Sequence, residues 1–307
     1  MKKKLLITGA NGLLGSNLVY QSVDRFDVTA CSLSEVGSAK PVDRVRMDVT
    51  DDAAVRRVVE DVKPDAIIHC AAETRVDFCE AHPERAARVN QAGTLSIARA
   101  AEEIGAAVIY VSSDSAFDGG SGNYSESDKP NPLNAYSRTK VAGEVSLVAS
   151  CTQHLIVRTN MFGWNMKPKE SLSEWVLNRL RAGEAFPGFQ DVVFAPLIVN
   201  DLAELLLEMY ESDLSGLYHV GARDHVSKYE FGRKIAELYD LDQDLIRPSI
   251  LDQANLTAPR PKVTYLDVTK AERALGRELP TVEEGLDTFL RLEKCGFVED
   301  LKSGLAP

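Results

Sequence analysis

The chain has 307 residues, of which 44% are hydrophobic and 26% charged, the balance of an ordinary globular protein. Its length fits one extended domain with an appended lobe, and its net charge of −11 argues against the basic stripe that a nucleic-acid surface requires. Dispersed cysteines, and the lack of any apolar run long enough for a membrane span or signal peptide, favour a cytoplasmic protein with no metal site and no membrane partner.

Two patterns of apolar residues alternate through the first half of the chain. Short apolar runs predict strands at residues 4–8, 26–32, 43–49, 64–72, 106–114 and 154–163. Helical spacing between them predicts helices at residues 12–23, 52–62, 83–105 and 135–149. Continuous apolar strands separated by helices are typical of a parallel sheet covered on both faces, so we expect an α/β fold with a doubly wound sheet.

The alternation loosens after about residue 164. Helices are predicted at 171–185, 199–212 and 227–241, and one further strand at 216–222. We therefore expect a main domain over 1–164, to which 196–221 returns, and a smaller C-terminal lobe from 165–195 and 222–295. The last residues, 296–307, are expected to form a frayed tail.

A glycine-rich turn follows the first predicted strand. Gly9, Gly12 and Gly15 have the spacing GxxGxxG and lie where the strand meets the next helix. Such a turn lets the backbone approach a pyrophosphate, whose charge is stabilised at the helix N-terminus. A tight structural turn would look the same, but its place at the start of a βαβ unit favours dinucleotide binding, which makes 1–164 an NAD(P)-binding, Rossmann-type core.

The second strand ends without an acidic residue. A carboxylate there would hold a ribose 2′-hydroxyl and select NAD, whereas this chain offers Cys31, Ser32 and Ser34. Serine hydroxyls do not repel a 2′-phosphate, so NADP(H) is favoured, while NAD(H) is still allowed because no arginine follows at once.

Two further strand ends carry cofactor candidates. Asp48 follows the third strand, where it could accept a hydrogen bond from adenine or serve as a turn or helix-capping residue. Ala71 and Ala72 follow the fourth strand and are small enough to lie against a cofactor, or simply against a helix.

A tyrosine and a lysine stand one helical turn apart in the segment NAYSRTK. Tyr136 and Lys140 share a helix face, either as an ordinary exposed pair or as a catalytic pair. A nearby ammonium favours the phenolate, so we expect Lys140 to lower the pKa of Tyr136 and make the phenol a proton donor. Ser112 and Ser113 end the fifth strand, where open α/β sheets place their ligands, and could hold a carbonyl group.

The order of these elements carries a family resemblance. The glycine turn, Ser113 and the YxxxK of Tyr136 and Lys140 resemble the extended short-chain dehydrogenase/reductase superfamily. The stretches YVSSDSAFDG, YSESDKPNPLNAYSRTKVAGE and APRP are similar to the dTDP-4-dehydrorhamnose reductases. The resemblance runs from residue 4 to about residue 276.

The resemblance implies a reaction and roles for particular residues. Hydride would pass from NADPH to the C4 ketone of a nucleotide-linked deoxysugar, most simply dTDP-4-dehydro-L-rhamnose to give dTDP-L-rhamnose. Ser113 and Asp114 would contact the sugar, Tyr136 would protonate its oxygen and Lys140 would hold the cofactor ribose. The residues that would bind the cofactor are Gly9, Asn11, Gly12, Leu13, Leu14, Gly15, Ser32, Asp48, Val49, Ala71, Ala72, Tyr136 and Lys140.

Individual residues help to distinguish the reductase from alternative functions. Related dehydratases carry an Asp-Glu pair where this chain has Asp114 followed by Ser115, which disfavours dehydration. Epimerases keep the same triad, so an epimerase or a reductase of another nucleotide sugar is an alternative. Another is a non-catalytic partner like the regulatory subunit of methionine adenosyltransferase, although the complete triad favours an enzyme. The rhamnose-forming reductases usually have a tryptophan where this chain has Met161; Trp164 is nearby but fits a core position as well.

The lobe and the loops should select the substrate. Arg260, between prolines, suits a diphosphate through its fork of donors, or is a surface arginine. Thr74 and Val76 follow the fourth strand and, by resemblance, line the sugar; Lys167 and Lys169 could contact phosphate. Residues 119–130 have the composition of a mobile flap. A homodimer is the default expectation for an enzyme of this size.

Overall fold

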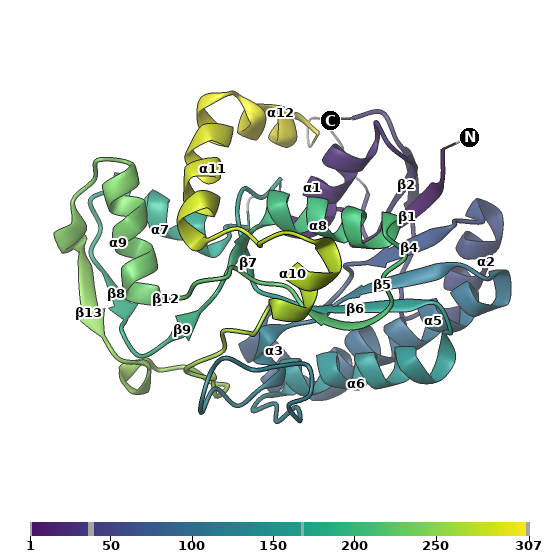
Figure 1. The fold of residues 1–307 in the computed structure, drawn as a ribbon, viewed down its shortest axis with the longest axis horizontal. Helices are drawn as coiled ribbons and strands as arrows, with labels where there is room; N and C mark the ends of the chain where they lie inside the picture. Colours follow the sequence, from purple (N-terminus) through teal and green to yellow (C-terminus); the bar gives the residue numbers. More distant parts are fainter. Residues whose placement is uncertain (1, 36–39, 167–168, 305–307) are drawn as a thin grey trace.

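A parallel sheet forms the centre of the molecule. The computed structural model describes residues 2–35, 40–166 and 169–304 (Figure 1). Within these residues, seven parallel strands lie in the order β11-β6-β5-β4-β1-β2-β3. The strands are β1 (Lys4–Thr8), β2 (Asp27–Ser32), β3 (Asp43–Arg46), β4 (Ala66–His69), β5 (Ala107–Val111), β6 (His154–Arg158) and β11 (Gly216–His219). The predicted doubly wound α/β fold is confirmed.

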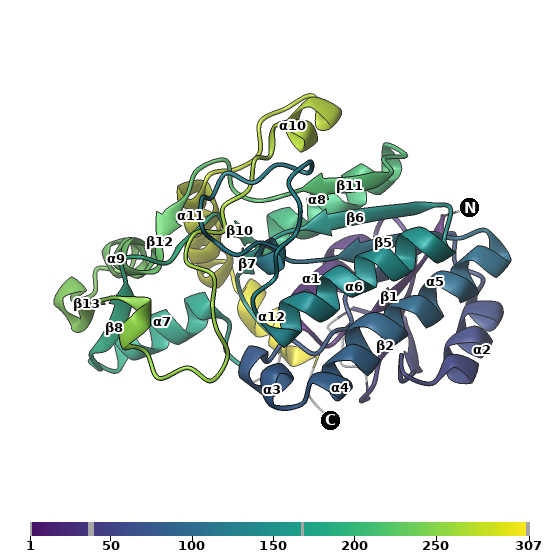
Figure 2. The ribbon, with the colours of Figure 1, turned by 90° about the horizontal axis from the view of Figure 1, so that it is seen from below.

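Helices cover both faces of the sheet (Figures 1 and 2). Successive strand residues point to opposite faces, so Leu5 and Ile7 enter one apolar core and Leu6 the other. The helices on the first face include α1 (Leu13–Ser22) and α8 (Val199–Glu211), and those on the second are α2 (Asp52–Val62), α5 (Gly93–Ile104) and α6 (Ala135–Ser150). Burial on both sides explains why the strands are continuous apolar runs.

The helix predicted over 83–105 is interrupted. It divides into α4 (Pro83–Ala87), a π-helical turn η1 (Arg88–Ala92) and α5, and is preceded by α3 (Val76–Ala81). The turn contains the buried Asn90, whose amide accepts from the backbone of Glu73 at 2.8 Å and donates to Thr139 on α6 at 3.0 Å. The interruption therefore ties this helix to the helix that carries Tyr136.

The lobe is built from helices and two-stranded ribbons, to one side of the main sheet in Figure 2. Its helices are α7 (Leu172–Arg181), α9 (Lys228–Leu238), α10 (Thr269–Leu275) and α11 (Val282–Lys294). In the lobe, the short strand β9 (Val193–Phe194) pairs with β12 (Val226–Ser227), and β8 (Phe186–Phe189) pairs with β13 (Ile246–Ser249). A third ribbon, of β7 (Met161–Phe162) and β10 (Leu197–Ile198), is formed by residues outside the bounds expected for the lobe. The strand predicted over 154–163 is thus split, because β6 ends at Arg158 and β7 joins a separate ribbon. No helix in the described residues is long and apolar enough to span a membrane.

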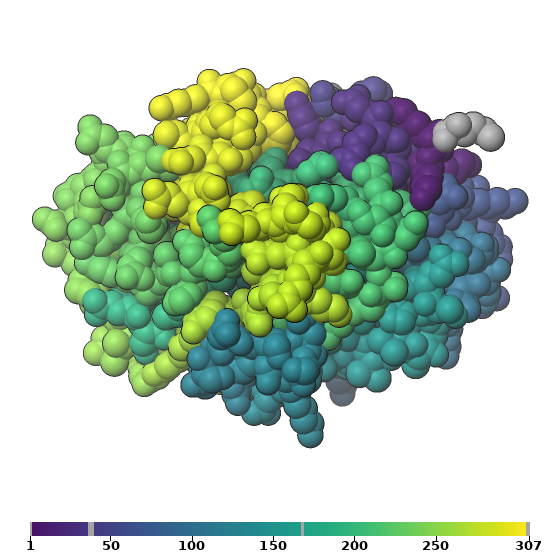
Figure 3. Space-filling view, in the orientation of Figure 1, coloured from purple at the N-terminus to yellow at the C-terminus, as the bar shows by residue number. Residues whose placement is uncertain are grey.

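The C-terminal segment does not fray as expected. Phe297–Ser303 forms α12, and residues 305–307 lie outside the described part. The ring of Tyr20 on α1 contacts Phe297 edge-on at 4.9 Å, and its hydroxyl donates to Asp300. Figure 3 shows this C-terminal part of the surface lying beside the N-terminal part. This apolar contact anchors the helix, and it could not be predicted from the composition of the C-terminal segment alone.

The expected flap over 119–130 is attached to the lobe. The backbone N–H of Val263 donates to Gly119 and that of Asp267 to Tyr124, at 3.1 and 2.8 Å. Phe117 and Tyr124 stack at 4.1 Å and are both buried. The loop therefore packs as an ordered element against residues 263–267.

Candidate active site

The glycine turn brings the backbone of β1 against the end of β4. Gly9 has a positive φ of 67°, and a Cβ at this position would lie 2.7 Å from the backbone nitrogen of Ala71. A Cβ on Gly15 would lie 2.2 Å from the Gly9 carbonyl oxygen, so the turn requires glycine at both positions. Helix α1 begins after Gly12 without a side-chain cap, which leaves the first N–H groups, from Leu13 on, to bind an anion. These features fit a dinucleotide pyrophosphate.

The adenosine end of the candidate cofactor site contains a guanidinium that the sequence analysis missed. Ser32 ends β2 and is paired in register with Arg46 on β3. The Nε of Arg46 donates to the carbonyl of Leu33 at 3.0 Å, and Asn11 donates to Ser34 at 3.0 Å. The positive charge suited to a 2′-phosphate is thus present on β3, in Arg46, although the sequence analysis considered only the residues after β2.

The other cofactor candidates have structural partners. The Asp48 carboxylate accepts from the backbone and hydroxyl of Thr50, at 2.9 and 2.8 Å, which makes it a turn residue. Val49 is buried, and a Cβ on Gly93 would lie 2.9 Å from one of its methyl groups. Ala71 is half-buried and its N–H donates to Thr8 at 3.3 Å. Their contact with adenine or nicotinamide stays a prediction.

The start of α6 is fixed from several sides. Asn134 caps the helix by accepting from the backbone N–H of Ser137 at 2.9 Å, and its amide donates to the carbonyl of Pro259 at 2.9 Å. The backbone N–H of Ala135 donates to Glu80 on α3 at 2.6 Å. Tyr136, in the first turn, is therefore held between α3 and the lobe.

Burial determines the titration of Tyr136 and Lys140. Burial raises the pKa of Tyr136 to about 12, against the opposing effect of hydrogen bonding by Ser113. The expectation that Lys140 would lower the pKa of Tyr136 is wrong for this structure, because burial raises that pKa. Burial also dominates at two neighbours of Lys140: it lowers the pKa of His69 to about 3, in the same direction as the charge of Lys140, and raises the pKa of Cys70 to about 12, against that charge. The ammonium of Lys140 lies 4.0 Å above the ring of Tyr110, and burial lowers its own pKa to about 7.

Ser113 and Asp114 lie at the end of β5, beside Tyr136. The Ser113 hydroxyl is 2.8 Å from that of Ser115. Asp114 is buried and accepts from Asn160 and Thr264, both at 2.7 Å, and burial raises the pKa of its carboxyl. The residue expected to contact the sugar thus also joins the sheet to the lobe.

Three of the predicted substrate residues lie at or beside the start of α3. Arg260 donates to Asp77 on α3 at 2.9 Å and to the carbonyl of Ala258 at 2.9 Å, and its side chain is partly exposed. Thr74 is exposed and accepts from Lys169 at 3.4 Å. Val76 is the half-buried first residue of α3, and Lys167 lies outside the described residues.

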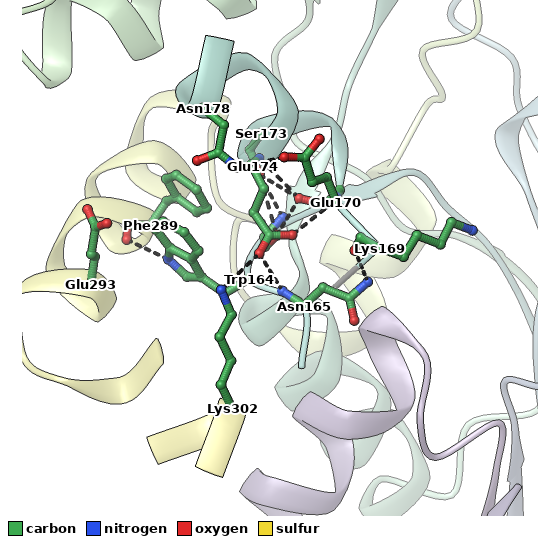
Figure 4. Close-up of polar contacts among 12 residues, drawn as sticks. Trp164, Asn165, Lys169, Glu170, Ser173, Glu174, Asn178, Phe289, Glu293 and Lys302 are labelled. Atoms are coloured by element: carbon green, nitrogen blue, oxygen red, sulfur yellow. Dashed lines mark hydrogen bonds and ion pairs between the residues drawn. The ribbon is translucent and has the colours of Figure 1, made fainter. Parts of the chain in front are cut away.

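Trp164 is a core residue, as Figure 4 shows. Its ring stacks on Phe289 at 4.0 Å, and its Nε1 donates to the Phe289 carbonyl at 2.9 Å. The following residue, Asn165, donates from its backbone to the buried carboxylate of Glu174 at 3.2 Å. Trp164 therefore does not take the place of the tryptophan that the rhamnose-forming reductases usually have at the position of Met161.

Two charged groups near the site escaped the sequence analysis. Lys228, the first residue of α9, has its ammonium 3.2 Å from the ring centroid of Phe194, and burial lowers its pKa to about 7 while Asp114 opposes this. Glu144, one turn beyond Lys140, is buried and accepts from Arg158 at 2.9 and 2.7 Å and from Ser112 at 2.5 Å. Two features of the sequence could have predicted this ion pair. Glu144 lies on the buried side of α6, and Arg158 ends an apolar strand.

Comparison with known proteins gives a consistent relationship. The model of the RmlD substrate binding domain matches residues 3–295. The probable low-salt glycan biosynthesis reductase Agl14 of Haloferax volcanii is 32% identical over 91% of this chain and 95% of its own. Methionine adenosyltransferase 2 subunit beta of Xenopus laevis is 33% identical over 91% of this chain and 84% of its own. The crystal structure of dTDP-4-dehydrorhamnose reductase from Bacillus anthracis in complex with NADP is 29% identical, covers 95% of this chain and 99% of its own, and superposes with a TM-score of 0.86.

Proposed function

The chain belongs to the family of the RmlD substrate binding domain, and from this premise we propose that it is an NADPH-dependent reductase of the C4 ketone of a nucleotide-linked deoxysugar. The simplest substrate is dTDP-4-dehydro-L-rhamnose, which would give dTDP-L-rhamnose. The observation that carries the proposal is the convergence of Ser113 and Tyr136 at the carboxyl end of the parallel sheet, where ligands bind such folds. The similarity to a dTDP-4-dehydrorhamnose reductase in complex with NADP supports it.

Each of the three residues has a task in this reaction. The bound nicotinamide supplies the hydride. The Ser113 hydroxyl donates to the ketone oxygen, and the Tyr136 phenol transfers its proton to that oxygen as negative charge develops there. A pKa of about 12 keeps Tyr136 protonated at neutral pH, which suits a proton donor. Lys140, on the same face of α6, holds the cofactor ribose.

The end of β2 supports a preference for NADPH. Ser32 and Ser34 place no negative charge there, and Arg46 on the neighbouring strand adds a guanidinium suited to a 2′-phosphate. The similar dTDP-4-dehydrorhamnose reductase from Bacillus anthracis forms a complex with NADP. NADH remains the comparison cofactor in the test below.

Residue 161 bears on the nature of the sugar. Met161 is half-buried in β7 and replaces the aromatic residue expected of the rhamnose-forming enzymes. An epimerase, or a reductase of another nucleotide sugar, would use the same three residues. The similarity to methionine adenosyltransferase 2 subunit beta favours, as a second candidate, a partner subunit without turnover.

Product analysis separates these candidates. The protein is incubated with dTDP-4-dehydro-L-rhamnose and either NADPH or NADH, and the sugar is examined by mass spectrometry and NMR. With a reductase the sugar gains two hydrogens, one on C4 and one on the C4 oxygen, and NADPH is consumed faster than NADH. An epimerase changes a stereocentre without net consumption of cofactor, and a partner subunit binds cofactor and leaves the sugar unchanged.

A further inference from the structure

Three serine hydroxyls connect the cap of α6 to Ser113. Ser137 donates to the hydroxyl of Ser115 at 2.9 Å, and the hydroxyl of Ser115 is 2.8 Å from that of Ser113. At its other end the row reaches Asn134, whose side-chain oxygen can accept from the same Ser137 hydroxyl at 2.9 Å, so the one proton of Ser137 serves either Ser115 or Asn134. Ser113 and Ser137 are buried and Ser115 is half-buried, so water competes little for these bonds.

Counting donors gives the row a direction. A serine hydroxyl has one proton to donate and two lone pairs to accept with. The single proton of Ser113 is used outside the row, by Asp114 at 3.2 Å or by the phenol of Tyr136, so the proton in the shorter bond between Ser113 and Ser115 comes from Ser115. The backbone N–H of Ser115 also donates to the Ser113 hydroxyl, at 3.2 Å. Both lone pairs of Ser113 are thus filled by one residue.

We propose that Ser115 is a positioning residue, which fills the acceptor sites of the Ser113 hydroxyl so that its proton is left to donate to the substrate ketone. This inference rests on the proposed reductase function. The long bond from Ser113 to Asp114 is the one exchanged for the ketone oxygen. When Ser137 gives its proton to Ser115 rather than to Asn134, it polarises the row in the same direction, because successive hydrogen bonds strengthen one another.

In this proposal, residue 115 acts as a hydrogen-bond donor to Ser113. In the sequence it is notable for not being the glutamate of the dehydratases. In the structure, the same short side chain is what reaches Ser113, and a glutamate in its place would bring an acceptor where a donor is needed.

Kinetics of matched variants test the role. Removing one hydroxyl donor in Ser115→Ala should lower kcat about tenfold, with the KM for the sugar changed far less, since one neutral hydrogen bond is at stake. Ser115→Thr, which keeps the hydroxyl, should restore most of the rate, and Ser137→Ala should give a smaller loss. The matched control is Ser127→Ala, which removes an exposed serine pair of the same 2.8 Å length, between Ser125 and Ser127. Full activity in Ser115→Ala, or equal losses in the alanine and threonine variants, would overturn the proposal.

A second readout does not depend on the sugar. Hydrogen bonding by Ser113 lowers the pKa of Tyr136, so a Ser113 that no longer donates outward should let this pKa rise further. Fluorotyrosine, which titrates at lower pH than tyrosine, is incorporated and followed by ¹⁹F NMR, with Tyr136→Phe to assign the signal. We expect a higher pKa in Ser115→Ala and none of this change in Ser127→Ala. An unchanged pKa in Ser115→Ala contradicts the inference even if no sugar is reduced, whereas a rise without turnover leaves it standing and counts against the proposed function alone.

Discussion

At the scale of single residues, the two titrating groups of the site are governed by burial more than by each other. Tyr136 has a pKa near 12 and Lys140 one near 7, because the sheet edge and α6 remove both from water. Neutral pH therefore finds the phenol fully protonated and the lysine partly neutral. In the proposed reduction, the proton of Tyr136 would be present before any substrate binds.

Lys140 gives a pH-dependent prediction. Above a pKa of about 7 the side chain is mostly neutral, and a ribose hydroxyl that accepts from the ammonium favours the charged form. NADPH binding at about pH 8 should therefore take up a proton, and binding at about pH 6, where the lysine is already charged, should take up much less. Calorimetry in buffers of different ionisation enthalpy measures this uptake. Lys140→Met should abolish it, and equal uptake in wild type and variant would assign the proton elsewhere.

The candidate residues were predictable from sequence where a strand end or helix turn dictates their position. Gly9, Ser113, Tyr136 and Lys140 follow from their places in a βαβ pattern. The row of hydroxyl groups that leads to Ser113 could not be predicted in this way. Ser115 and Ser137 lie in two elements, and no local sequence pattern specifies how these elements pack together.

At the scale of elements, α6 is fastened to the sheet by a buried ion pair. Glu144 and Arg158 have side-chain exposures of 8% and 3%, and Ser112 on the neighbouring strand adds a third bond. The pair holds the helix that carries Tyr136 against β5 and β6.

Breaking this pair should be costly. Glu144→Ala leaves an uncompensated buried guanidinium, so we expect the free energy of unfolding to fall by about 3–5 kcal/mol. The control is Glu278→Ala, which removes the partner of Arg223 at an exposed position and should change it by less than about 1 kcal/mol. Urea denaturation of both variants supplies the comparison; similar losses would mean that the buried pair has no special role.

An element was easier to predict from the sequence when its apolar residues stood out from the flanking polar residues. The central strands β1, β4, β5 and β6 are buried and mostly apolar, so their composition alone identifies them, whereas the edge strand β3 is mostly exposed. The two-residue strands β7, β9, β10 and β12 are too short for any period to register. The π-helical turn at Arg88–Ala92 and the docking of α12 depend on tertiary contacts, of Asn90 and of Tyr20, that the local sequence does not encode.

At the scale of the whole molecule, the lobe is joined to the sheet domain around the candidate site. Thr264 reaches Asp114, Pro259 accepts from Asn134, and Arg260 pairs with Asp77. These contacts come from one segment of the lobe, so the position of the lobe is linked to that of the candidate site residues. The division into a 1–164 core and a lobe from 165–195 and 222–295 stays a proposal.

The pair of Arg260 and Asp77 predicts an effect on substrate binding. If Arg260 binds the diphosphate of the sugar nucleotide, Asp77 competes for the same guanidinium. Asp77→Asn should then lower the KM for the sugar nucleotide severalfold, and Arg260→Gln should raise it about tenfold, while affinity for NADPH is unchanged in both. Asp252→Asn, at the exposed partner of Lys262, is the control. A KM that rises in Asp77→Asn would make the pair a structural tie.

The most direct measurement compares wild type and Tyr136→Phe for consumption of NADPH with dTDP-4-dehydro-L-rhamnose, alongside fluorescence titration of NADPH binding. We expect the variant to bind NADPH as the wild type does and to lose about 10²–10⁴-fold in kcat, the range that a positioned general acid contributes. Turnover that survives the loss of the phenol would contradict the role of Tyr136 as proton donor. A wild type that binds NADPH and reduces no nucleotide-linked 4-keto sugar would contradict the reductase itself.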